Sequence, residues 1–236
     1  MRILALDTAT ENCSVALLIG HRLSTREERL PRGHAERILP MVDELLTESG
    51  TALRGLDAIA YGRGPGAFTG VRLAASITQG LAFGAGLPVV PVSDLRAVAQ
   101  RAFDTLPGPR VLVCSDARMQ EVYWACFERA TDGLAAPAGE EQVSAPAEVS
   151  LPARWPDGTP GVGSGFAAYP VLVRTLAGRV SPWPETLLPR AAEIARLAQP
   201  EVVAGRVLPA DQAVPVYLRN EVARSPAAAV IKLTPG

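Results

Sequence analysis

Two aspartates at the ends of short β-prone runs are the first candidates for chemistry. Asp7 follows the apolar run at residues 3–6, and Asp116 follows the apolar run at residues 111–114. A polar turn and a second β-prone run come after each of them, so both carboxylates are expected at the tip of a hairpin. Together they could hold a metal ion if the two hairpins faced each other across a cleft. Alone, each is more often a turn-capping carboxylate.

A glycine-rich stretch, Gly62 to Gly66, is the second candidate, because it leads directly into a predicted helix. A Walker-type phosphate loop needs a lysine after its last glycine, but Val71 follows Gly70 here. A dinucleotide-binding fingerprint fails as well, since Thr69 stands where its third glycine belongs. We interpret the stretch as a tight turn that feeds a helix capped by Thr69. An anion site at the helix N-terminus stays open as the alternative.

The sequence offers little for nucleophilic catalysis. His21 and His34 are its two histidines, and His34 is interpreted as a solvated residue at a helix end. Ser164, in the segment GVGSGF, lacks the spacing of a nucleophile elbow and is expected in a turn. No Ser-His-Asp arrangement is therefore predicted.

Composition indicates an ordinary globular protein. The 236 residues are 48% hydrophobic, which is enough for a sizeable core. The net charge is -1 and Lys232 is the single lysine, so the sequence lacks the dense basic patch that is typical of nucleic-acid-binding proteins. No apolar stretch approaches the roughly 20 residues that cross a bilayer, and we expect a cytoplasmic protein without membrane contact. Cys13, Cys114 and Cys126 share no metal-ligand spacing and are expected to be free buried thiols in a reducing compartment.

Apolar periodicity predicts strands alternating with helices, which indicates an α/β fold. Helices are expected over residues 35–48, 69–83 and 94–103, and Pro40 should kink or open the first of them. Residues 130–160 are expected to be irregular. Because hairpins with an aspartate at the tip recur about half a chain length apart, two related halves are predicted.

Longer motifs resemble those of the bacterial TsaB (YeaZ) family over nearly the whole chain. They are ILALDTAT, CSVAL, GHAERILPMVDELL, GRGPGAFTGVRLAASITQGLAFGAGLPVVPVSDL, DARMQEVYW and PVYLRNEVA, and the stretch from Gly64 to Arg72 is the most specific. The resemblance implies an actin-like ATPase (ASKHA) fold of two related βββαβαβα lobes, the second of them degenerate. The expected division is an N-terminal, partner-binding lobe at residues 1–104, a C-terminal lobe at 105–222 and a loosely held tail at 223–236.

The same resemblance implies a role in making threonylcarbamoyladenosine in tRNA. It implies that the chain is a required, non-catalytic partner of TsaD. TsaD is the transferase that modifies the adenosine beside the anticodon in tRNAs that read codons beginning with A. TsaE is implied as the ATPase of a larger complex. In TsaD an HxxxH pair binds the metal; Asp94 and Val98 stand at those positions here. Actin-like ATPases carry a glycine after the first hairpin's aspartate, where this chain has Ala9. No catalytic residue, metal ligand or cofactor is therefore assigned, and the isolated chain is expected to lack ATPase, peptidase and transferase activity.

Two sets of residues follow for binding. Asp7, Thr8 and Thr10 are candidates for a vestigial nucleotide site. A TsaD-binding surface is expected on two helices of the first lobe, with burial in the chain's own core as the alternative. Its members are Ile38, Met41, Val42, Leu45, Val71, Ala74, Ala75 and Thr78. A homodimer stays open for the chain when it is alone.

Binding of tRNA is expected only through the complex. Arg22, Arg26, Arg29 and Arg32 could form a local basic cluster, although Glu27 and Glu28 lie among them. An autonomous actin-like ATPase and an M22-type peptidase-like enzyme remain the alternative functions.

Overall fold

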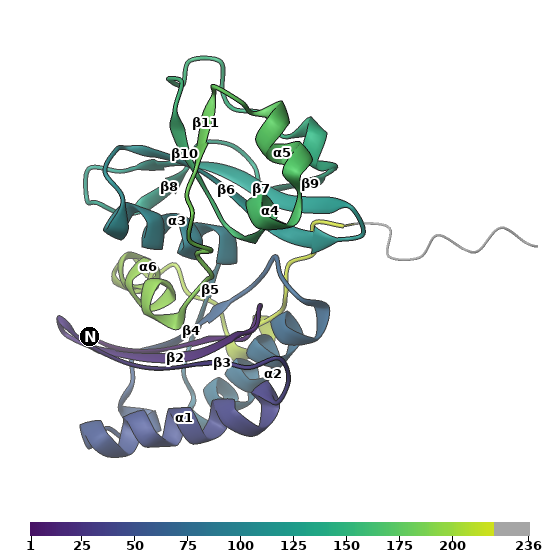
Figure 1. Ribbon diagram of the computed structural model, residues 1–236. Coiled ribbons are helices and arrows are strands. Elements are labelled where there is room, and N and C mark those ends of the chain that lie inside the picture. The colour runs from purple at the N-terminus through teal and green to yellow at the C-terminus, as the bar shows by residue number, and fades with distance from the viewer. Residues whose placement is uncertain (220–236) are drawn as a thin grey trace, which may run out of the picture.

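The computed structural model describes residues 1–219, so the expected tail at 223–236 lies outside the described residues. Figure 1 shows two sheets with helices between them and further helices on both outer faces. Among residues 1–219, no helix has the length and hydropathy of a membrane span.

The first sheet has the strand order β3-β2-β1-β4-β5. Its first three strands form an antiparallel meander, and β4 and β5 continue the sheet parallel to β1. The strands are β1 (Arg2–Asp7), β2 (Asn12–Ile19), β3 (Arg22–Arg29), β4 (Ala58–Gly62) and β5 (Val89–Val92). Every residue of β4 is buried and all but the first of β1 are, as expected for parallel strands covered on both faces.

The second sheet repeats this order as β8-β7-β6-β10-β11, with β9 also paired to β7. Here too the first two strands are antiparallel and the last two run parallel to the first. The strands are β6 (Arg110–Arg118), β7 (Glu121–Arg129), β8 (Ala135–Pro137), β9 (Gln142–Ser144), β10 (Thr159–Val162) and β11 (Val180–Pro182). The predicted duplication is therefore confirmed by topology.

The second lobe is the degenerate one. Between its meander and β10 it has only a short 3-10 turn at Pro146–Glu148, where the first lobe has the long helix α1 (His34–Ser49). The expectation of irregular structure over residues 130–160 is wrong in part, because β8 and β9 lie there. Both pair along β7, which extends the sheet by backbone hydrogen bonds that composition does not reveal.

Helices α1 and α2 (Phe68–Ala85) cover the outer face of the first sheet, and α4 (Ser164–Ala168) and α5 (Pro170–Thr175) lie on the outer side of the second (Figure 1). Pro40 lies inside α1 and does not begin it. The N-cap of α2 is Ala67. The prediction of Thr69 as the cap is wrong, because the close approach of the preceding turn to β1, described below, makes the helix begin earlier.

Two helices lie between the sheets and link the lobes. Helix α3 (Asp94–Thr105) ends the first lobe in sequence but packs its apolar side chains into the core beneath the second sheet. Helix α6 (Ala191–Val203) ends the second lobe in sequence but packs against the first sheet. The lobes thus exchange helices, a feature that adds to the two related lobes that the resemblance implied.

Residues 214–219 cross back from the first lobe to the second, and we call them the C-terminal strap. The Tyr61 hydroxyl donates to the Val214 carbonyl (3.0 Å), and the Val216 amide donates to the Arg63 carbonyl (2.8 Å). At the other end, the Arg219 guanidinium donates to Glu121 and to the Ala117 carbonyl (3.1 Å) on the second lobe.

Candidate functional site

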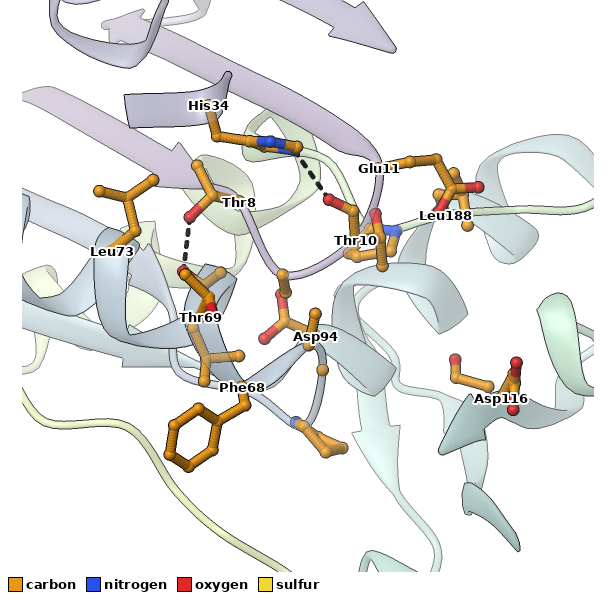
Figure 2. A pocket seen from close by; sticks show the side chains of 18 of the residues that line it. Thr8, Thr10, Glu11, His34, Phe68, Thr69, Leu73, Asp94, Asp116 and Leu188 are labelled. Carbon is orange, nitrogen blue, oxygen red and sulfur yellow. Dashed lines mark hydrogen bonds between the residues drawn. The ribbon is translucent and has the colours of Figure 1, made fainter. Parts of the chain in front are cut away.

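A cavity of about 970 Å³ lies between the lobes. Its walls come from the β1–β2 turn, the start of α1, the corner between β4 and α2, the ends of β6 and β7, and the strap. Figure 2 shows Asp94 and Asp116 on opposite sides of this space, one from each lobe. Of the two carboxylates picked out at the hairpin tips, Asp116 lines the cavity and Asp7 is fully buried, and each is already engaged within its own lobe.

The glycine-rich corner packs directly against the backbone of the β1–β2 turn. A Cβ atom added to Gly70 would stand 2.0 Å from the Thr8 carbonyl oxygen, and one on Gly66 would stand 2.6 Å from that of Ala9. The Ala67 amide donates to the Ala9 carbonyl (2.8 Å), and the Thr8 hydroxyl donates to the Gly70 carbonyl (2.7 Å). The chain's own backbone thus occupies the space beside the first turn of α2. This geometry favours close packing over an anion site as the role of the glycines.

Asp7 and Asp94 form a buried carboxyl pair over Gly62. Both side chains are almost inaccessible, and a Cβ atom on Gly62 would lie within 2.9 Å of an oxygen of each. Asp7 accepts from the Ala9 amide (2.8 Å), and Asp94 accepts from the Gly64 amide (2.5 Å). Their second oxygens, Asp7 Oδ2 and Asp94 Oδ1, have no partner within the described residues apart from each other's carboxyl group.

Burial governs the protonation of this pair. Desolvation raises the pKa of Asp7 to about 6, and desolvation together with the charge of Asp7 raises the pKa of Asp94 well above its usual range. Two buried carboxyls that share one proton satisfy each other only while that proton is present. The pair therefore ties the end of β1 to the start of α3.

Asp116 is held in a different way at the second hairpin. It accepts from the Arg118 amide (2.8 Å) and from the Tyr169 hydroxyl (2.7 Å), and it pairs with the Arg118 guanidinium (3.1 Å). Its own amide donates to the hydroxyl of Ser164, the first residue of α4 (3.0 Å). The interpretation of Asp7 and Asp116 as turn-capping carboxylates is confirmed. Within residues 1–219, no cluster of three or more His, Cys, Asp or Glu side chains has the arrangement of a metal site.

Comparison with known proteins identifies the family. The family model described as "TsaD: tRNA N6-adenosine threonylcarbamoyltransferase" matches residues 27–162. The "tRNA threonylcarbamoyladenosine biosynthesis protein TsaB" of Escherichia coli is 45% identical, covering 94% of this chain and 96% of its own length. That of Haemophilus influenzae is 43% identical, covering 94% and 95%. The chain belongs to the TsaB family.

A solved relative shares the whole fold. The structure titled "YeaZ from Pseudomonas aeruginosa" superposes with a TM-score of 0.85 at 46% identity, covering 92% of this chain and 99% of that one. The resemblance drawn from the motifs is thus confirmed, as is the α/β fold of two related lobes.

The positions that correspond to the TsaD metal pair are poorly suited to a metal here. Asp94 is buried in the carboxyl pair, and Val98 is 1% exposed in the core beneath the second sheet. Val98 offers no donor atom, so the two cannot replace a pair of histidines.

The candidates for a vestigial nucleotide site are brought together by the β1–β2 turn, although two of them point inward. Asp7 and Thr8 are buried and engaged as described. Thr10 lies on the cavity wall, where its carbonyl is hydrogen-bonded to the His34 ring nitrogen Nε2 (2.9 Å, Figure 2). His34 lies at a helix end, as expected, but it is only partly exposed because its ring contacts this turn.

The helix side chains assigned to a partner surface lie in the interior of this chain. All eight are between 0 and 4% exposed: Ile38, Met41, Val42, Leu45, Val71, Ala74, Ala75 and Thr78. They pack toward the first sheet, so the stripe marks the inward faces of α1 and α2. The exposed apolar residues of these helices are others, Leu39 at 47% and Phe83 at 81%. In the sequence these two exposed residues could have been recognised because each is apolar but falls outside the helical periodicity of the buried positions.

The remaining sequence candidates have structural explanations. Arg26 pairs with Glu44 (3.0 Å) and Glu48, which reduces the positive charge of the predicted arginine cluster along β3. The three cysteines are free and buried, as expected. Sequence analysis did not single out Phe68, Tyr217 or the turn after Ala117, which carry exposed apolar or cationic side chains around the cavity.

Proposed function

We propose that this chain is a non-catalytic subunit in the biosynthesis of threonylcarbamoyladenosine in tRNA. It would act in the cytoplasm as the partner of a TsaD-type threonylcarbamoyltransferase, with TsaE in a larger complex, and would meet tRNA through that complex. The names of its full-length relatives and the TsaD-type family model support this biosynthetic role. The alternative of a homodimer applies to the chain when it is alone.

The buried carboxyl pair is the observation that carries the non-catalytic assignment. Asp94 is committed to Asp7 and to the Gly64 amide, and Val98 has no ligand atom. The corner beside α2, where an actin-like enzyme would bring backbone amides to a phosphate, is filled by the backbone of Thr8 and Ala9. Neither the position of the metal pair nor the phosphate-binding corner is therefore open to a substrate.

The outward face of α2 supports the proposed partnership. Ser76, Gly80, Phe83 and Gly84 are all exposed on this helix, at spacings that place them along one side. A Cβ atom on Gly80 or Gly84 would meet nothing within 4 Å, so these glycines leave the helix backbone open to close approach by another helix. Phe83 stands beside them at 81% exposure and would provide an apolar anchor.

Substitution of Gly80 tests this surface without disturbing the core. Gly80→Arg should abolish co-purification with TsaD, because it places a long cation where a partner helix would pack. The open space around Gly80 predicts that the variant folds normally, as circular dichroism and thermal unfolding would show.

Gly139→Arg is the matched control, since Gly139 lies on the second lobe and also has no atom within 4 Å of its added Cβ. It should bind TsaD as the unchanged chain does. In cells whose own copy of the gene is deleted, Gly139→Arg should restore threonylcarbamoyladenosine in tRNA and Gly80→Arg should not. Normal modification with Gly80→Arg, or none with the unchanged chain, would contradict the proposal.

A further inference from the structure

Two exposed aromatic rings hold a guanidinium between them at the rim of the cavity. Phe68, the first residue of α2, is 58% exposed, and Tyr217 of the strap is 45% exposed. Their ring centroids are 6.3 Å apart, and Arg72 Cζ lies 3.2 Å from the Phe68 centroid and 4.8 Å from that of Tyr217. Figure 2 shows the Phe68 ring at the edge of the cavity, pointing away from Asp94. We call Phe68, Arg72 and Tyr217 the rim cluster.

The charge of Arg72 has no carboxylate partner within residues 1–219. Its single hydrogen bond there is a long one to the Phe68 carbonyl (3.4 Å). By contrast, Arg63 is paired with Glu141 (3.1 Å) and Arg26 with Glu44. The cation–π contacts with the two rings hold the Arg72 guanidinium in place, and its N–H groups can still donate to an anion.

A second cation is held in place on the other lobe, at the rim of the same cavity. Arg118, Met119 and Gln120 have φ angles of 62°, 55° and 62°, a left-handed conformation that non-glycine residues rarely adopt. This turn is anchored from both sides, by Asp116 through the Arg118 amide and by Arg219 through the Ala117 carbonyl. The Arg118 side chain is 87% exposed, and both it and Tyr217 border the cavity.

We propose that the rim cluster stacks an unpaired base of RNA and that Arg72 binds the adjoining phosphate. Exposed aromatic rings, with arginine side chains beside them, are the usual means by which proteins hold single-stranded bases. Both rings are partly exposed, and Arg118, which also borders the cavity, provides a second phosphate contact where a phosphate replaces its partner Asp116, which suits a chain of nucleotides better than a single one. The inference rests on the proposed function, since the RNA is the loop of the tRNA that the complex modifies.

Binding of a fluorescein-labelled anticodon stem-loop RNA to the complex of this chain with TsaD, measured by anisotropy, is the test. Phe68→Ala, Tyr217→Ala and Arg72→Gln should each weaken binding about tenfold, as loss of one stacking or phosphate contact does. Two matched controls should leave the affinity unchanged. Trp183→Ala removes an aromatic ring that is 37% exposed and lies away from the cavity, and Arg174→Gln removes an exposed positive charge from α5.

The outcomes separate this inference from the proposed function. If the complex forms and the three rim variants bind RNA like the unchanged chain, the rim cluster is not an RNA site, while the proposed function stands. If free AMP at equal nucleotide concentration displaces the RNA, the cluster is a mononucleotide site and the RNA assignment is wrong.

If no complex forms with TsaD, the proposed function fails and the isolated chain decides the inference. Photocrosslinking with a 4-thiouridine-substituted loop should then label the peptides that contain Phe68 or Tyr217. Crosslinks confined to other peptides would overturn the inference.

Discussion

The buried carboxyl pair of Asp7 and Asp94 is the residue-scale feature with the clearest consequence for stability. The pair is buried between β1 and α3, and its pKa values are raised chiefly by desolvation. A carboxyl whose pKa is higher in the folded chain than in the unfolded chain binds more protons when folded. The free energy of unfolding therefore falls as pH rises through the folded pKa.

We expect the chain to lose stability between about pH 4 and about pH 7. For Asp7 the pKa moves from 3.8 to about 6, so the loss over this whole range is on the order of 3 kcal/mol. Urea unfolding at about pH 4 and about pH 7.5 measures it. Asp94→Asn should flatten this dependence, because the amide oxygen still accepts from the Gly64 amide and its NH₂ group donates to Asp7 without a shared proton. An equally steep decline in Asp94→Asn would show that other groups are responsible.

At the scale of elements, α2 contains one glycine in very close backbone contact and another that faces open space. Gly70, in its first turn, faces the Thr8 carbonyl at a distance that no Cβ atom tolerates, whereas Gly80 faces open space. Replacing each of these two glycines by alanine therefore separates the effect of close backbone packing on stability from the effect of helix propensity.

Gly70→Ala should lower the free energy of unfolding by about 3 kcal/mol, because the β1–β2 turn must move to admit the methyl group. Gly80→Ala should raise it by up to about 1 kcal/mol through helix propensity alone. Chemical denaturation of both variants checks these values. Similar effects of the two substitutions would mean that the corner is not tightly packed against the turn.

The sequence predicted where the helices and strands lie better than it predicted what they pack against. Periodicity located α1, α2 and α3, because an apolar stripe is dictated by the inward face of a helix. The same stripe could not say whether that face meets the chain's own sheet or a partner, and Ile38 and Ala75 proved to be core residues. Thr69 was a misleading cap signal, since the start of α2 is set by a contact with Thr8 some sixty positions away. The C-terminal strap has no hydrophobic periodicity. Its role in connecting the lobes depends on where the two lobes lie, which the sequence does not specify.

At the scale of the whole molecule, the exchange of α3 and α6 explains how two small lobes make one structure. Each sheet is covered on its inner face by a helix from the other half of the sequence, and the strap adds a third connection near the cavity. Hydrophobic periodicity marks these helices as amphipathic but does not specify which sheet they cover, so the exchange was not predictable from the residues. The placement of Arg118 relative to the rim cluster depends on it too, since Phe68 and Arg118 belong to different lobes.

The charge distribution of the whole chain predicts how it meets tRNA. With a net charge of -1, and with Arg26, Arg37 and Arg63 already paired to glutamates, the chain has no surplus of positive charge for phosphates. At the cavity rim Arg72 supplies one contact, and Arg118 supplies a second where a phosphate replaces its partner Asp116, so the logarithm of the binding constant should fall with that of salt concentration with a slope of about -1 to -2. The isolated chain should therefore bind labelled tRNA weakly, with a Kd of about 10⁻⁵ M or above at physiological salt, and TsaD should tighten binding. Tight binding by the chain alone, with a slope steeper than about -5, would identify it as the tRNA-recognition subunit instead.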